Sequence, residues 1–219
     1  MENLTGNDLI QFVIDQKVPV ETVELILIFP IIATVIVIAR QVMGIKAFGI
    51  YTPSLVALAF ISTGLKYGIF LFLMILITGT ATRLIVRRFR LLYLPRVAIM
   101  LTVVSITILL MLIIGGYFKM TGFASVSIFP ILILITIMEK FISVQVEKGF
   151  KTAFYLSFLT LVLSIISYYI ANFQALRDLM TSHPWLIFIV ILFNILLGKW
   201  TGLRVSEYYR FREVIKRNN

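Results

Sequence analysis

The stretch VAIMLTVVSITILLMLIIGGYF, residues 97–118, contains no acidic or basic side chain. A helix of about 20 apolar residues crosses a bilayer core about 30 Å thick, so this stretch is long enough to span a membrane. Directly before it, the segment RRFRLLYLPR at 87–96 carries four arginines. An apolar run that follows a basic loop predicts a membrane-spanning helix with that loop on the cytoplasmic side.

The rest of the chain has the same character. Of its 219 residues, 60% are hydrophobic and 14% are charged, whereas soluble domains have about 25% charged residues. This excludes an ordinary soluble domain, because one core of this size cannot bury so much apolar surface. Cysteine is absent and His183 is the one histidine, and no phosphate-binding loop is present. We therefore expect no catalytic residue, no metal site, no cofactor and no enzymatic activity of the chain itself.

Long uncharged stretches recur along the chain and predict seven membrane spans, hence an all-α polytopic membrane protein. They run over 25–39, 47–65, 67–82, 97–118, 120–138, 152–176 and 179–198. The two shortest are expected to continue past their flanking charges, with Glu24, Arg40 and Arg83 reaching toward the membrane surface.

The basic residues predict how the chain is oriented. With seven spans, 16 of the 20 Lys and Arg residues fall on one side, the side of the 87–96 loop. The positive-inside rule then places the N-terminus outside and the C-terminus in the cytoplasm, in the inner membrane of a prokaryote. The net charge of +10 is explained by this orientation and not by nucleic-acid binding. We expect an outer amphipathic lead-in over 1–18, a seven-helix membrane domain over 19–204 and a basic cytoplasmic tail over 205–219.

Two prolines occupy equivalent places in the second and fifth spans. Pro53 and Pro130 each lie near the start of a span that follows one full span and precedes another. The chain therefore divides into three spans, three further spans and one more. Because three is odd, the second triplet would enter the membrane from the opposite side, which predicts an inverted repeat.

The segments before these prolines have two readings. Proline removes one helical hydrogen bond and restrains the preceding residue, so 49–52 and 125–129 are predicted as extended or broken backbone. Broken or half helices at Pro53 and Pro130 would have to face protein or a wet cavity, as at transporter substrate sites. Alternatively, each proline lies in the first turn of a helix, where it is harmless.

Several short stretches together resemble a known family, the seven-helix membrane domain usually fused to an inactive transglutaminase-like domain. They are RQVMGI at 40–45, FGIYTP at 48–53, ALAF at 57–60, TGL at 63–65, LPR at 94–96, FP at 129–130 and GKWTGLR at 198–204, followed by Glu207 and RFR at 210–212. This resemblance implies the same seven-helix fold.

Residues 44–170 are more distantly similar to the capsule-biosynthesis C subunit of poly-γ-glutamate synthases. That similarity implies a membrane subunit of a complex that synthesises or exports an amino-acid polymer or peptide-like product. The partner it implies is a cytoplasmic ATP-dependent amide ligase of ATP-grasp or Mur-ligase type. Apart from this resemblance, the expected partners are membrane lipids, with a separate extracytoplasmic subunit and a second copy of the chain as further candidates. Two other hypotheses remain, a scaffold that docks the ligase without a permeation path and an independent ion-coupled transporter.

Two groups of residues are candidate sites. The predicted substrate path follows the two proline segments and the charges beside them, comprising Arg40, Gln41, Gly44, Gly49, Thr52, Pro53, Ser125, Ser127, Pro130 and Glu139. The predicted docking surface for a partner or for anionic lipid lies on the basic loop and tail, comprising Arg87, Arg88, Arg90, Arg96, Arg204, Glu207, Tyr208, Arg210, Phe211 and Arg212.

Overall fold

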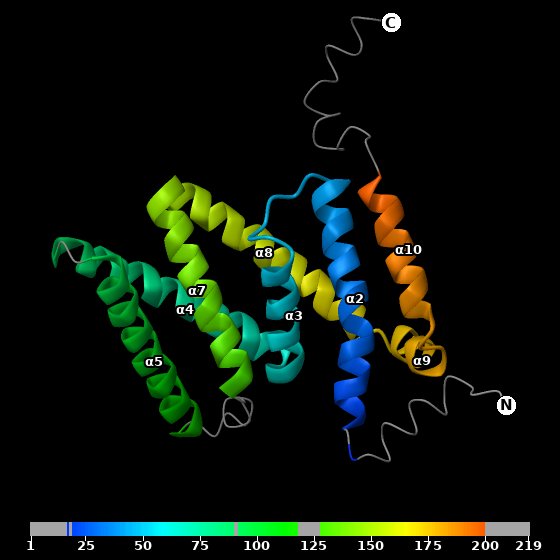
Figure 1. The fold of residues 1–219 in the computed structure, drawn as a ribbon. Coiled ribbons are helices and arrows are strands. Elements are labelled where there is room, and N and C mark those ends of the chain that lie inside the picture. Colours follow the sequence, from blue (N-terminus) through cyan, green and yellow to red (C-terminus); the bar gives the residue numbers. More distant parts are fainter. Residues whose placement is uncertain (1–16, 18, 90–91, 118–127, 200–219) are drawn as a thin grey trace, which may run out of the picture. The chain divides into compact units, whose positions relative to one another are not determined.

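The structure is a computed structural model that describes residues 17, 19–89, 92–117 and 128–199. Within these residues the fold is all-α, with 88% of them in helices and no strand. The described helices divide into two compact units (Figure 1). Unit 1 comprises 1–54 and 169–219, and unit 2 comprises 55–168.

Unit 1 contains three described helices from opposite ends of the chain. They are α2 (Val20–Gln41), α9 (Gln174–Ser182) and α10 (Leu186–Gly198). Helices α2 and α10 lie side by side (Figure 1). As expected, α2 continues beyond both Glu24 and Arg40.

Polar side chains link the helices of unit 1. Asn194 Nδ2 of α10 donates a hydrogen bond to Thr34 Oγ1 of α2 at 2.6 Å, and Thr34 Oγ1 in turn donates to the carbonyl of Pro30 at 2.8 Å. Arg177 of α9 forms an ion pair with Glu24 of α2 at 3.5 Å. Its guanidinium also donates to the Ala171 carbonyl and to Asn172 Oδ1, both at 2.7 Å. Each helix contact of unit 1 therefore includes a satisfied polar group.

Unit 2 is built around α4, which packs against both α5 and α7. The helices are most of α3 (Tyr51–Thr63), α4 (Leu65–Val86), a 3-10 turn η1 (Arg87–Phe89), α5 (Tyr93–Tyr117), α7 (Ile128–Lys148) and most of α8 (Phe150–Ala171). At the α4–α7 contact, a Cβ placed on Gly79 would lie 2.8 Å from Met138 Cγ. The glycine therefore permits the close approach of these two helices.

Five described helices are long and apolar enough to cross a membrane, namely α2, α4, α5, α7 and α8. Helices α9 and α10 form a pair bent by 110°, so the described part of the chain has up to six candidate spans. The bend lies at His183, Pro184 and Trp185, because a residue before proline is disfavoured in helical conformation. The predicted seventh span is thus not one straight helix.

The predicted second span is also shorter than expected. Helix α3 has 13 residues, about 20 Å of helix, against a bilayer core of about 30 Å. Glycines with positive φ stand at both sides of it, Gly49 at 72° and Gly64 at 78°. These conformations end the helix early. The count of seven spans is therefore not confirmed by the described residues, and the inverted repeat stays a prediction.

Both prolines lie in the first turn of a helix. Pro53 is the third residue of α3 and Pro130 is the third residue of α7, where a missing N–H costs no intrahelical hydrogen bond. The prediction of broken backbone over 49–52 and 125–129 is therefore wrong in part. The irregular connection between α2 and α3 occupies 42–50, whereas Tyr51 and Thr52 already belong to α3. Ile128 and Phe129 belong to α7, and 125–127 lies outside the described residues. Helix α7 runs to Lys148 instead of ending near Met138, since Glu139 and Lys140 lie on its exposed face.

Candidate functional site: a three-arginine cavity

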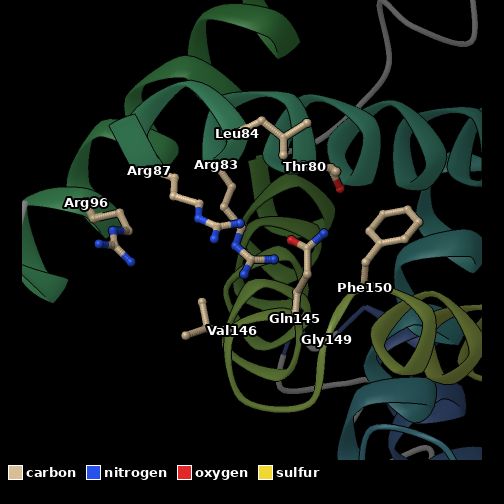
Figure 2. Close-up of a pocket in the computed structure, with 9 residues that line it drawn as sticks. All are labelled: Thr80, Arg83, Leu84, Arg87, Arg96, Gln145, Val146, Gly149 and Phe150. Atoms are coloured by element: carbon tan, nitrogen blue, oxygen red, sulfur yellow. The ribbon is translucent and has the colours of Figure 1, made fainter. Parts of the chain in front are cut away.

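A cavity of about 790 Å³ lies at one end of unit 2 (Figure 2). It is formed where the C-terminal ends of α4 and α7 meet the N-terminal ends of α5 and α8. Its lining residues are Thr80, Arg83, Leu84, Arg87, Arg96, Gln145, Val146, Gly149 and Phe150. Three arginines and no carboxylate are among them, which makes this cavity the candidate site for an anionic group.

Helix α4 contributes one face to the cavity. Thr80, Arg83 and Arg87 recur at intervals of three and four residues, which places them above one another on a helix. The Thr80 hydroxyl donates to the Leu76 carbonyl at 2.8 Å, so it is satisfied inside its own helix. Cations at the C-terminal end of a helix also interact favourably with its dipole. This local effect favours Arg83 in the last turn of α4 and Arg87 directly after it.

Arg83 and Arg87 lie near each other without an anionic partner among the described residues. Arg83 is half-buried and close enough to Arg87 and Arg96 for their charges to interact. Within the described residues, the side chains of Arg83 and Arg87 form no hydrogen bond or ion pair, whereas Arg177 of unit 1 does. Like charges at close range repel. A bound anion would remove this repulsion.

Gln145 of α7 lies beside the arginines and was missed by the sequence analysis. Its side chain is buried, 3% exposed, and its Oε1 atom has no hydrogen-bond partner. Figure 2 shows the amide next to the guanidinium groups of Arg83 and Arg87. The sequence spacing could have identified it, because Gln145 shares the buried face of one helix with Met138, Phe141 and Ile142. A polar residue at an apolar position is costly unless it is paired.

The junction between α7 and α8 completes the cavity. Gly149 has a φ of 88° and allows the chain to turn directly from one helix into the next. Its carbonyl accepts a hydrogen bond from the N–H of Ala153 at 3.1 Å, and the ring of Phe150 stacks on Phe154. The first turn of α8 therefore begins at the cavity wall, with its N-terminal dipole end on that side.

A family model described as 7 transmembrane helices usually fused to an inactive transglutaminase matches residues 2–215. The chain belongs to this family. It is therefore a membrane protein, in agreement with its long apolar helices. No curated protein and no solved structure matches the chain. The more distant resemblance to the capsule-biosynthesis subunit stays a prediction.

In this family the seven transmembrane helices are usually fused to a transglutaminase described as inactive. That description is consistent with a chain that contributes no catalytic group of its own. The expected division at residues 18 and 204 remains a prediction, since most of both end segments lies outside the described residues.

The predicted substrate path is not part of the three-arginine cavity. Gln41 has a structural role, because its Nε2 donates to the Leu197 carbonyl of α10 at 2.6 Å. Thr52 and Pro53 are buried, and Gly44 has a positive φ of 78° like the neighbouring Gly49. Arg40 is half-buried in the last turn of α2.

The second half of that path is described only in part. Pro130 is buried and Glu139 is exposed on α7. Ser125 and Ser127 lie outside the described residues. None of the predicted path residues lines the cavity of Figure 2, so the path remains a separate prediction.

The predicted docking surface overlaps the cavity. Arg87 and Arg96 line it, and Arg88 borders a neighbouring cavity of about 590 Å³ together with Leu84, Ile85 and Phe89. The other members lie outside the described residues; they are Arg90, Arg204, Glu207, Tyr208, Arg210, Phe211 and Arg212. The sequence analysis thus named two of the three cavity arginines as docking residues and mentioned Arg83 only as a charge near a span end.

Proposed function

We propose that this chain is the membrane subunit of a complex that synthesises or exports an amino-acid polymer or peptide-like product. In this proposal a cytoplasmic ATP-dependent amide ligase of ATP-grasp or Mur-ligase type performs the chemistry, and the chain itself is not catalytic. One observation carries the proposal. The end of unit 2 presents Arg83, Arg87, Arg88 and Arg96 with no acidic residue among the lining residues of its two cavities. Such a cationic end attracts an acidic partner surface or product.

The proposal requires this basic end to face the cytoplasm, with the N-terminus outside and the C-terminus inside the inner membrane of a prokaryote. The chain has no cysteine, so single cysteines can report the orientation. Lys66 and Phe89 are both exposed and lie at opposite ends of α4 and η1. Lys66→Cys should react with an impermeant thiol reagent in intact cells, and Phe89→Cys should react only after the membrane is opened. The reverse pattern would contradict the proposal.

Docking of the ligase is tested at Arg88, which is exposed and does not line the three-arginine cavity. The tagged chain is purified gently and the soluble proteins that accompany it are identified. We expect an amide ligase whose retention falls in Arg88→Ala and not in Lys66→Ala. The two substitutions remove the same charge at opposite ends of one helical segment. Absence of any ligase in the wild-type preparation would contradict the proposal.

A scaffold that docks the ligase without a permeation path differs from an exporter in one measurable respect. If the chain transports the product, inverted vesicles that contain the chain and the ligase should accumulate labelled polymer in their lumen. If it is a scaffold, the polymer should remain outside while ligase retention still depends on Arg88. An independent ion-coupled transporter would accumulate product without any ligase.

A further inference from the structure

The three-arginine cavity combines cationic side chains with an apolar wall, a name used here for Leu84, Val146 and Phe150. Figure 2 shows these three apolar side chains around Arg83, Arg87 and Arg96, on the helices α4, α7 and α8. We propose that this cavity binds the head group of an anionic phospholipid, with the phosphate at the arginines and an acyl chain along the apolar wall. The proposal goes beyond the function proposed above and does not depend on it.

The position of the cavity along the helices fits the level of lipid phosphates. Helix α4 has 22 residues, a length of about 33 Å, which is close to the thickness of a bilayer core. Arg83 lies in its last turn and Arg87 directly follows it. The guanidinium groups are therefore at the end of a span, where head groups begin. Basic pockets between membrane helices are known to bind such head groups.

The charge of the cavity favours a phosphate. The charges of Arg87 and Arg96 both act on the Arg83 guanidinium, and an anion bound beside Arg83 would offset this repulsion. Arginine presents a planar set of N–H donors that matches phosphate oxygens in pairs. Arg83 and Arg87 have all of these donors available, since neither side chain has a hydrogen-bond partner within the described residues.

Gln145 specifies a head group that also carries a hydrogen-bond donor. Its buried Oε1 accepts no hydrogen bond among the described residues, and an unsatisfied buried acceptor costs free energy that a donor on a bound ligand would recover. A phosphodiester alone has no donor for this atom. A glycerol head group has hydroxyls that can donate to Oε1 while the adjacent phosphate accepts from the arginines. The cavity chemistry therefore points to phosphatidylglycerol in particular.

The apolar wall distinguishes a lipid from a soluble anion. Leu84 is 67% exposed and Phe150 is 52% exposed, and in a membrane protein such exposed apolar side chains contact lipid. A carboxylate-rich oligomer would bring further charges against this wall and lose their hydration. An acyl chain covers the wall without that cost. The cavity volume of about 790 Å³ also exceeds the space that one phosphate ion needs.

Lipid retention by the purified full-length chain tests the proposal. The chain is purified in detergent, mixed with dioleoyl-phosphatidylglycerol or dioleoyl-phosphatidylcholine, and examined by native mass spectrometry. We expect phosphatidylglycerol to be retained preferentially. Arg83→Gln and Arg87→Gln should each weaken its binding about fivefold, since one cation near a membrane surface contributes about 1 kcal/mol. Lys66→Gln, at the other end of α4, should leave binding unchanged. Equal retention of both lipids by the wild type would overturn the proposal.

A second variant tests the role of Gln145 without changing the charge. Dioleoyl-phosphatidylethanol has the same phosphodiester charge as phosphatidylglycerol but no hydroxyl. The wild type should prefer phosphatidylglycerol about fivefold, the effect of one hydrogen bond. Gln145→Leu should bind the two lipids equally. The substitution replaces an unsatisfied buried amide by an apolar side chain of similar size, so the fold should persist. A preference that survives in Gln145→Leu would contradict the assigned role.

Soluble competitors distinguish the sources of the anion. Inorganic phosphate and γ-linked triglutamate are each added to the complex with phosphatidylglycerol. Displacement of the lipid by millimolar phosphate, dependent on Arg83, would overturn the lipid proposal in favour of a free-phosphate site. Displacement by triglutamate with the same dependence would overturn it in favour of a polymer site and would support the proposed function. Retention of phosphatidylglycerol against both competitors supports the lipid site. The ligase experiment at Arg88 is unaffected by any of these results.

Discussion

Polar side chains are used differently in the two units. In unit 1 they are paired across helices, as in the contacts of Asn194 with Thr34 and of Arg177 with Glu24. In unit 2 the cavity holds polar groups that have no such partner among the described residues, namely Arg83, Arg87 and the Oε1 atom of Gln145. Paired polar groups stabilise a membrane fold, whereas unpaired ones cost free energy and are available to a ligand. We therefore expect substitutions at the contacts of unit 1 to change stability, and substitutions at the cavity of unit 2 to change binding of an anion.

The largest effect is expected where helices of unit 2 pack most closely. Gly79→Val places side-chain carbons against Met138, because even a Cβ would lie 2.8 Å from its Cγ. We expect the free energy of unfolding to fall by about 1–3 kcal/mol, measured by SDS titration in mixed micelles. Met138→Ala should restore part of the loss when combined with Gly79→Val. If the double variant were no more stable than Gly79→Val alone, the α4–α7 contact would not be the cause.

Arg177→Met tests the paired side of the comparison. The substitution keeps much of the apolar length and removes the ion pair to Glu24 and the hydrogen bonds to Ala171 and Asn172. Both charged side chains are about a quarter exposed, so solvent weakens the pair. We expect the free energy of unfolding to fall by about 1–2 kcal/mol. Lys66→Met is the matched control, and an equal loss in that variant would contradict a specific role for Arg177.

Arg83→Met is the counterpart of Arg177→Met in the unpaired region. It removes a half-buried charge that two neighbouring arginines repel. In lipid-free micelles we expect the free energy of unfolding to stay the same or to rise by up to about 1 kcal/mol. In micelles with phosphatidylglycerol the wild type should gain stability that the variant lacks. A loss of stability without lipid would show that Arg83 is a structural residue.

The fold class could be predicted from the sequence because long apolar runs depend on local composition. Spans that included a charge at an end, such as α2 beyond Arg40, were also expected correctly. The lengths of α3 and α10 were not predictable in this way. These lengths depend on the backbone conformation at Gly49, Gly64 and Pro184. Because the sequence stays uncharged and apolar across such a turn, hydrophobicity alone does not show where the helix begins or ends.

The site was harder to predict than the fold. Arg87 and Arg96 were expected on a docking surface because charge clusters are visible in a sequence. The spacing of Arg83 and Arg87 on one helical segment is also a local pattern. The approach of Arg96 depends on the packing of α5 against α4, which no local pattern encodes. The sequence does not predict Gln145 as a site residue, because it lies 62 positions after Arg83. The sequence predicts broken helices at Pro53 and Pro130 because proline disrupts a helix interior. Both residues lie in the first turn of a helix, where proline is well tolerated.

The smallest effect is expected at the contact between α2 and α10. Asn194 Nδ2 donates both to Thr34 Oγ1 at 2.6 Å and to the carbonyl of Val190 in its own helix at 2.9 Å. Asn194→Leu therefore removes one bond between helices, and Thr34 keeps its bond to Pro30. Hydrogen bonds between membrane helices contribute on average about 0.6 kcal/mol, because the unfolded chain in lipid also finds partners.

A double-mutant cycle with Thr34→Val measures this contribution directly. We expect a coupling free energy of about 0.6 kcal/mol in SDS titration, since each single substitution removes the same bond. Gln41, which donates to Leu197 at the far end of the same helix pair, supplies the control through a cycle of Asn194→Leu with Gln41→Leu. That pair shares no bond and should be additive. Coupling between Asn194 and Gln41 as large as that between Asn194 and Thr34 would mean that α10 shifts as a whole. The polar contacts of unit 1 would then stabilise the fold as one group, and the free energy could not be divided among its single hydrogen bonds.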